Sequence, residues 1–210
     1  MPVPTTRRLT NVISRSKLMN RTFWSDVLRD GAILGLVMAL SRIIENTLQL
    51  QSTMSVATTY LILVVEMLAS TALFVYLVHR FAKRRAMAAD PAEGFAYGQG
   101  LIYVFVLSVL TGILVGLANT LYIAALGYDS YVDGVVASME STAEFVAQLD
   151  PTGAAAGSYN QMMDQIIETI ESTPCPTVFD NILASLNSYI TWGTLLGLII
   201  ARMVRREPKF

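Results

Sequence analysis

Three charged side chains interrupt apolar segments that are long enough to cross a membrane. Arg42 and Glu45 lie in the segment at about residues 27–50, and Glu66 lies near the middle of the segment at about residues 56–78. An ionised group at the centre of a bilayer costs about 3 kcal/mol on insertion scales, so it needs a partner or water. A carboxyl group withdrawn from water can also hold a proton near neutral pH. The chemistry open to this cluster is therefore ion pairing, proton relay or the binding of a polar solute.

The depths of these side chains predict which of them meet. If the first segment enters the membrane at Gly31, Arg42 lies ~16 Å deep, and Glu66 lies ~18 Å from the same face in the second segment. A short loop makes the two segments antiparallel neighbours, so we predict an Arg42–Glu66 ion pair, with Glu45 one turn further out beside Arg42. Three interpretations stay open: a structural pair that fixes the register of two helices, a binding or relay site, and a contact of Glu66 with a partner protein.

Other catalytic and metal-binding patterns are missing from the sequence. One histidine and one cysteine, Cys175, cannot build a His/Cys zinc site or an intrachain disulfide. There is no glycine-rich phosphate loop, nucleophile elbow, two-histidine motif or calcium loop. No basic surface with aromatic platforms is evident, as nucleic-acid binding requires. We expect no enzyme activity, no catalytic residues, no metal, no cofactor and no nucleic-acid partner. Cys175 is either a free thiol or an intermolecular disulfide partner.

Four apolar segments must position the charged cluster. Hydrophobic residues make up 53% of the 210 residues and charged residues only 15%, which is typical of a membrane protein. The segments lie at about residues 27–50, 56–78, 97–126 and 182–204, and they predict an all-α integral membrane four-helix bundle. Three of them carry a small-xxx-small pattern that lets helix backbones approach closely, either within the chain or between protomers: Gly31 and Gly35, Gly112 and Gly116, and Gly193 and Gly197. Asn46, Asn119, Asn187 and Ser188 are expected to hydrogen-bond between helices.

The distribution of charge predicts the topology. All lysines and arginines except Arg42 lie in the two terminal regions and the second loop. The positive-inside rule therefore places both termini, including residues 205–210, in the cytoplasm, and residues 127–181 outside. We expect the bacterial inner membrane, with the outer segment in the periplasm. Residues 1–29 form either a basic cytoplasmic tail or a helix lying in the membrane interface.

The outer segment of residues 127–181 is acidic and has no lysine or arginine. Its apolar residues recur at helical spacing on either side of a turn at residues 150–153, with carboxylates on the other faces. It is expected to form an external amphipathic helical hairpin within a membrane domain at residues 30–204.

Two short motifs flank the third apolar segment. They are Phe95-Ala96-Tyr97-Gly98-Gln99 at its start and Gly127-Tyr128-Asp129-Ser130-Tyr131 after its end. Together with the layout of the apolar segments, they resemble the bacterial membrane-protein family called domain of unknown function (DUF) 4199, over roughly residues 28–204. The resemblance implies a fold and a membrane location. It implies no activity and no functional residues.

Three classes of function fit these patterns. The first is a non-enzymatic accessory or scaffold protein that docks a partner through its membrane helices and its external hairpin. The second is a small transporter or proton-coupled carrier that uses Glu66 with Arg42. The third is a lipid-processing enzyme, for which Asp90 and Glu93 near the basic end of the second segment are the available acids. The expected partners are membrane lipid and either another protein or further copies of the chain.

Overall fold

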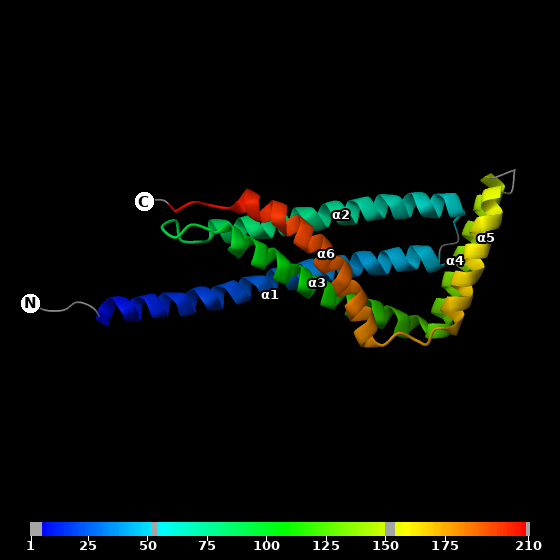
Figure 1. Cartoon of the computed structure of the whole chain (residues 1–210). Helices are drawn as coiled ribbons and strands as arrows, with labels where there is room; N and C mark the ends of the chain where they lie inside the picture. The colour runs from blue at the N-terminus through cyan, green and yellow to red at the C-terminus, as the bar shows by residue number, and fades with distance from the viewer. Residues whose placement is uncertain (1–5, 52–53, 150–153, 209–210) are drawn as a thin grey trace, which may run out of the picture.

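The computed structural model describes the backbone of residues 6–51, 54–149 and 154–208, and the side chains of residues 23–50, 54–148, 157, 161–170 and 172–208. Within these ranges the chain is all-α, as predicted. It forms six helices (Figure 1): α1 Thr6–Gln51, α2 Val56–Met87, α3 Tyr97–Leu126, α4 Tyr128–Leu149, α5 Ala154–Ser172 and α6 Val178–Val204. Residues 1–5 and 209–210, part of the first loop and the predicted turn at residues 150–153 lie outside the described residues.

Three helices of the described chain are long and apolar enough to cross a membrane: α2, α3 and α6. The helix α1 is not one of them, and Arg42 and Glu45 interrupt its apolar half. α1 runs beside α2 and α3 for much of its length (Figure 1). Three candidate spans are therefore assigned from length and composition, and a crossing by α1 is a proposal.

The helix α1 is longer than its predicted apolar segment. It has 46 residues, so it is about 69 Å long at the rise of an α-helix. Residues 6–29 continue the apolar half of α1 without a break. The start of α1 extends beyond the other helices (Figure 1), whereas Val27 is already part of the core. The described backbone of α1 therefore includes both its apolar half and the basic residues before it, and a tail or interfacial helix at residues 1–29 stays a prediction.

The helix ends follow local backbone chemistry. The Thr177 hydroxyl accepts a hydrogen bond from the amide of Asp180 at 3.2 Å, and the Asp180 carboxylate accepts one from the amide of Thr177 at 2.9 Å. This capping box starts α6. At the other end of the outer segment, Gly127 has a φ of +87°, a conformation that favours glycine, and it turns the chain from α3 into α4.

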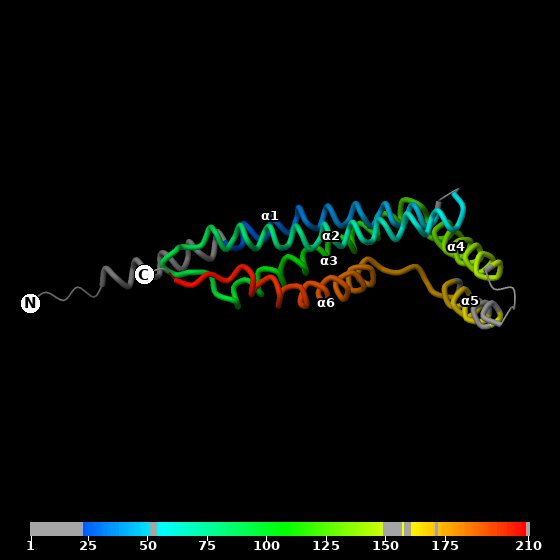
Figure 2. The backbone as a smooth tube through the Cα atoms, turned by 90° about the horizontal axis from the view of Figure 1, so that it is seen from above, coloured from blue at the N-terminus to red at the C-terminus, as the bar shows by residue number. Residues whose placement is uncertain are grey.

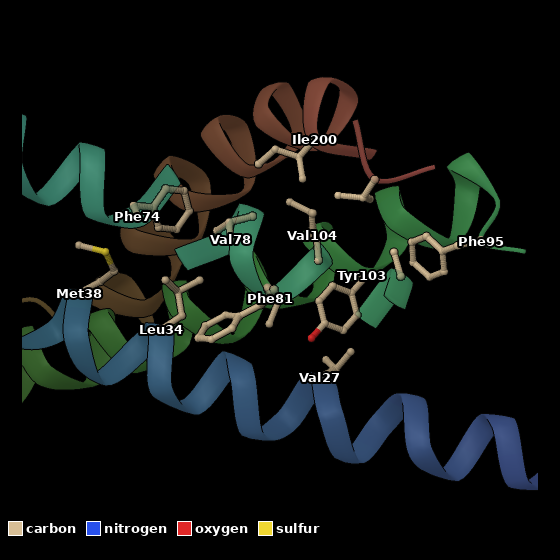
Figure 3. Packing of buried hydrophobic residues seen from close by; sticks show 14 of the residues in the cluster. Val27, Leu34, Met38, Phe74, Val78, Phe81, Phe95, Tyr103, Val104 and Ile200 are labelled. Carbon is tan, nitrogen blue, oxygen red and sulfur yellow. The ribbon is translucent and has the colours of Figure 1, made fainter. Parts of the chain in front are cut away.

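The helix α3 is the centre of the bundle. It packs against α1 on one side and α6 on the other, and Figure 2 shows it between these two helices. Tyr103, Val104 and Leu107 of α3 are fully buried. Figure 3 shows Tyr103 and Val104 meeting side chains of α1, α2 and α6, among them Val27 and Val78. This core of described residues therefore holds four helices together, with α3 as their common neighbour.

The helices α4 and α5 form a pair that crosses the end of the bundle opposite the two termini (Figure 1). The pair is anchored through α4. The Tyr60 hydroxyl of α2 hydrogen-bonds the Thr142 hydroxyl at 2.8 Å, and Gly134 packs against Leu50 of α1. Among the described residues, α5 contacts α4 and no other helix. The segment for which the sequence predicts an external hairpin therefore holds two helices, with α5 outermost, and their position outside a membrane stays a prediction.

Candidate functional site

The six glycines of the small-xxx-small patterns lie at internal helix contacts. Those of α1 receive leucines of α3: a Cβ added at Gly31 would lie 2.6 Å from Leu110 Cδ1, and one added at Gly35 would meet Leu114. These glycines therefore bring α1 and α3 together within one chain.

The α3–α6 contact is closer still, because backbone meets backbone. A Cβ added at Gly112 would lie 3.0 Å from Leu186 Cα, and one added at Gly116 would lie 2.6 Å from Ile182 Cα. The glycines of α6 lie further along the same contact, Gly193 against Ser108 and Gly197 against Leu101. This tight pairing fixes α6 along α3.

The helices α2 and α6 diverge toward the outer end, by which we mean the end that carries α4 and α5. They meet where the rings of Phe74 and Tyr189 pack edge to face, with centroids 5.6 Å apart. Beyond this pair α6 slants away from α2 (Figure 1). A cavity of about 280 Å³, called here the polar cleft, opens in this gap. It is lined by Met38, Ser41, Arg42, Glu45, Ser70, Val115, Asn119, Asn181, Ala184, Ser185, Ser188 and Tyr189.

An ion pair lies on the α1 wall of the polar cleft. Arg42 Nη1 donates to Glu45 Oε2 at 2.7 Å, one helical turn along α1. The pair is not enclosed: 46% of the Arg42 side chain and 36% of the Glu45 side chain are exposed. The guanidinium of Arg42 and the carboxylate of Glu45 are therefore accessible from the polar cleft.

The predicted Arg42–Glu66 ion pair does not form. Glu66 instead accepts a hydrogen bond from the hydroxyl of Ser41. The two helices are antiparallel, and Glu66 lies opposite this part of α1, as the depth argument required. Successive residues of a helix point about 100° apart, however. Ser41 therefore faces α2, and Arg42 points around the helix toward Glu45 and the cleft.

Three asparagines from three helices form a chain of hydrogen bonds beside the polar cleft. Asn46 Nδ2 of α1 donates to Asn119 Oδ1 of α3 at 3.0 Å, and Asn119 Nδ2 donates to Asn181 Oδ1 of α6 at 2.9 Å. The sequence pointed to Asn46 and Asn119, but the third member is Asn181, whereas Asn187 is exposed. Among the described residues, the buried Nδ2 of Asn181 has no hydrogen-bond partner. This series of hydrogen bonds therefore ends at Asn181, whose buried Nδ2 donates no hydrogen bond to the described residues.

A second charged cluster lies at the opposite end of the bundle, and the sequence reasoning missed it. Asp30 of α1 is 1% exposed. Its carboxylate accepts hydrogen bonds from the Tyr103 hydroxyl at 2.5 Å, from Arg29 Nε at 3.1 Å and from Arg84 of α2. The sequence held one signal for this cluster: Asp30 lies at the start of the first apolar segment, and the basic run at residues 80–85 ends the antiparallel second segment. This cluster ties α1, α2 and α3 together, and both carboxylate oxygens of Asp30 accept hydrogen bonds within it.

The described residues hold no group of three histidine, cysteine, aspartate or glutamate side chains that could bind a metal ion. Cys175 is exposed and not in a disulfide within the chain. The arrangement of the polar cleft suits hydrogen bonding and charge pairing, through one guanidinium, one carboxylate, amides and hydroxyls.

Comparison with known proteins gives a family and no closer relative. Neither the curated proteins nor the solved structures compared with the chain contain a match. The family model described as "Protein of unknown function (DUF4199)" matches residues 29–206. This range holds both charged clusters, the polar cleft and all six packing glycines. The chain therefore belongs to the DUF4199 family, a family of unknown function, and three of its helices are long and apolar enough to be compatible with a membrane protein.

Proposed function

We propose that this chain is a non-enzymatic accessory protein of the bacterial inner membrane that docks a partner protein through its polar cleft and its α4–α5 pair. In this proposal α1 crosses the membrane with α2, α3 and α6. The basic end of α2 and both termini lie at one end of the bundle, and the acidic pair α4–α5 lies at the other (Figure 1). The positive-inside rule then favours cytoplasmic termini and a periplasmic α4–α5 pair.

The observation that carries the proposal is the exposure of the Arg42–Glu45 pair within the membrane part of the bundle. Lipid chains cannot hydrogen-bond a guanidinium or a carboxylate, so charges at this depth face water or protein. A helix from a partner, lying between α2 and α6, would cover the pair. Polar residues on such a helix could also hydrogen-bond the hydroxyl of Ser188, which is exposed in the cleft, because transmembrane helices associate through hydrogen bonds of this kind.

The acidic surface of the α4–α5 pair favours a partner that is basic where it contacts this pair. The described acids of α5, Asp164 and Glu168, are exposed, and Met162 and Ile166 are exposed beside them. Residues 127–181 contain no lysine or arginine. A second copy of this surface would repel the first, and so would anionic headgroups. The occupant we propose is therefore a different protein, with a basic and partly apolar segment outside the membrane and a polar residue in one transmembrane helix.

Site-specific photo-crosslinking in cells tests the proposal. A photoreactive residue replaces Ser188 in the cleft or Ile166 on α5, and the matched control replaces Leu68, which is exposed on the apolar surface of α2. We expect the same single protein to be captured at Ser188 and Ile166 but not at Leu68, and to be lost from Ser188 in the double variant Arg42→Leu/Glu45→Leu. Capture of this chain itself at both sites, or of lipid at all three, would overturn the proposal.

A second candidate function, a small proton-coupled carrier, is favoured by the placement of Glu66. Its carboxyl lies in the middle of a candidate span and has a hydroxyl donor, Ser41, in place of the predicted cation. A carrier would acidify vesicles under an imposed potential, and Glu66→Gln would abolish this. The matched control is Glu140→Gln, which removes an exposed acid of α4. Equal rates of acidification in vesicles that contain the purified wild-type protein and in protein-free vesicles would exclude the carrier.

A further inference from the structure

A basic cavity lies at the end of the bundle opposite α4 and α5, between the last turns of α2 and the end of α6. Its volume is about 340 Å³. Its lining includes four basic side chains, two from each side: His79 and Lys83 of α2, and Arg205 and Arg206 after α6. No carboxylate is among its lining residues in the described part of the chain. This concentration of positive charge is separate from the polar cleft and from the Asp30 cluster.

The cavity is built from fixed elements. Arg206 Nη1 donates to the carbonyl oxygens of Ala86 and Met87 at 3.1 and 3.4 Å, where α2 ends. The backbone of Arg206 also exchanges two hydrogen bonds with Phe95, at 2.9 and 3.0 Å. The chain after α6 is therefore held against the end of α2 and the start of α3, so Arg205 and Arg206 have defined positions.

The acids nearby do not neutralise this cavity. Glu207 accepts a hydrogen bond from Arg205 at 3.3 Å, but its side chain is 81% exposed. It lines a neighbouring cavity of about 810 Å³, together with Arg202 and Arg205. Asp30 is occupied by Arg84 and Tyr103 on the other side of α2. His79 and Lys83 are in none of the ion pairs of the described residues.

We propose that this basic cavity binds the phosphate of an anionic phospholipid headgroup. Lysine and arginine are the side chains that bind phosphate in proteins, and basic pockets between transmembrane helices at the membrane surface suit anionic headgroups. His79 lies one turn, ~6 Å, deeper along α2 than Lys83, so possible hydrogen-bond donors to a phosphate extend from the end of the helix toward the membrane. Met87 and Met203 are exposed at the lining, which suits the glycerol and first acyl carbons of a lipid. Inorganic phosphate shares the headgroup chemistry but not this apolar contact.

Native mass spectrometry of the purified full-length chain in detergent tests the site. The probes are phosphatidylglycerol, phosphatidylcholine and inorganic phosphate, each added alone. The test variant is Lys83→Gln/Arg205→Gln. The control variant is Arg80→Gln/Arg202→Gln, which removes one exposed cation from each of the same helices outside this cavity.

Wild-type protein should retain phosphatidylglycerol, and retention should fall by roughly 30-fold in the test variant, as expected for the loss of two cations near a membrane surface. The control should change little. Equal loss in both variants, equal retention of the two lipids, or displacement of the lipid by inorganic phosphate would overturn the proposal. The double variant Lys83→Arg/Arg205→Lys keeps both charges and should retain the lipid. If it also fails, shape and not charge governs the cavity, and the proposal is wrong. The site depends on the membrane placement and not on partner docking, so purified protein tests it separately.

Discussion

The α3–α6 contact gives the sharpest test of the packing, through the substitution Gly116→Ala. A Cβ at this position would lie 2.6 Å from Ile182 Cα and 2.8 Å from the carbonyl oxygen of Asn181. Carbon atoms in contact lie about 3.5–4.0 Å apart, so α6 must move by roughly 1 Å. Backbone atoms have no alternative rotamer, so the strain cannot be relieved by a side chain. The shift would also pull Asn181 from Asn119 and open one wall of the polar cleft.

Overpacking of this kind costs about 1–3 kcal/mol, and the short contact with backbone places Gly116→Ala toward the upper end. Alanine recovers about 1 kcal/mol through its higher helix propensity, so the free energy of unfolding should fall by about 2 kcal/mol. The matched control is Gly98→Ala, also in α3, because a Cβ there meets nothing within 4 Å. Its free energy of unfolding should rise by up to about 1 kcal/mol.

Unfolding of the purified protein in mixed micelles, with increasing sodium dodecyl sulfate, measures both free energies. The expected difference between the two variants is about 3 kcal/mol, the sum of the net loss of about 2 kcal/mol at Gly116 and the gain of about 1 kcal/mol at Gly98. If Gly116→Ala is as stable as Gly98→Ala, the backbone contact between α3 and α6 is not as close as described, and the fixed wall of the cleft is refuted.

Three further substitutions can be measured with the same assay. Arg42→Leu should destabilise the purified protein by at most about 1 kcal/mol, because the Arg42–Glu45 pair that it breaks is partly exposed, and adding Glu45→Leu should cost little more. Tyr103→Phe should cost about 1.5–3 kcal/mol because it removes a hydrogen bond to the buried carboxylate of Asp30. Asn119→Leu should cost about 1–2 kcal/mol because it removes both hydrogen bonds of the Asn119 side chain, to Asn46 and to Asn181. No change in any of the three would contradict the contact it removes.

The sequence predicted the helices well, because their signals are local. The predicted third segment coincides with α3, Tyr97–Leu126, since an uncharged run is bounded by turn residues on both sides. The position of Glu45 beside Arg42 was also predictable, because residues three apart share a helix face.

Which side chains meet between helices was harder to predict. Depth along the helix placed Glu66 correctly relative to α1, but depth carries no information on rotation about the helix axis. Ser41 and not Arg42 therefore faces Glu66. The same lack of rotational information favoured Asn187 over Asn181, which lies on the face of α6 that meets α3. Asp30 was missed because it lies at the end of an apolar segment, where charged residues are common. Only its partners on α2 and α3 show that it is buried.

The central claim is that a partner helix covers the polar cleft in the native membrane. Reactivity of a single cysteine tests it most directly: Ser188→Cys in a Cys175→Ser background, labelled with a small, membrane-impermeant maleimide. The matched control is Ser141→Cys, which is exposed on α4. We predict that Ser188→Cys is protected in native membranes and reacts after purification of the chain alone, whereas Ser141→Cys reacts in both. Equal reactivity of Ser188→Cys in native membranes and in the purified chain would mean that water fills the cleft, and it would contradict partner docking.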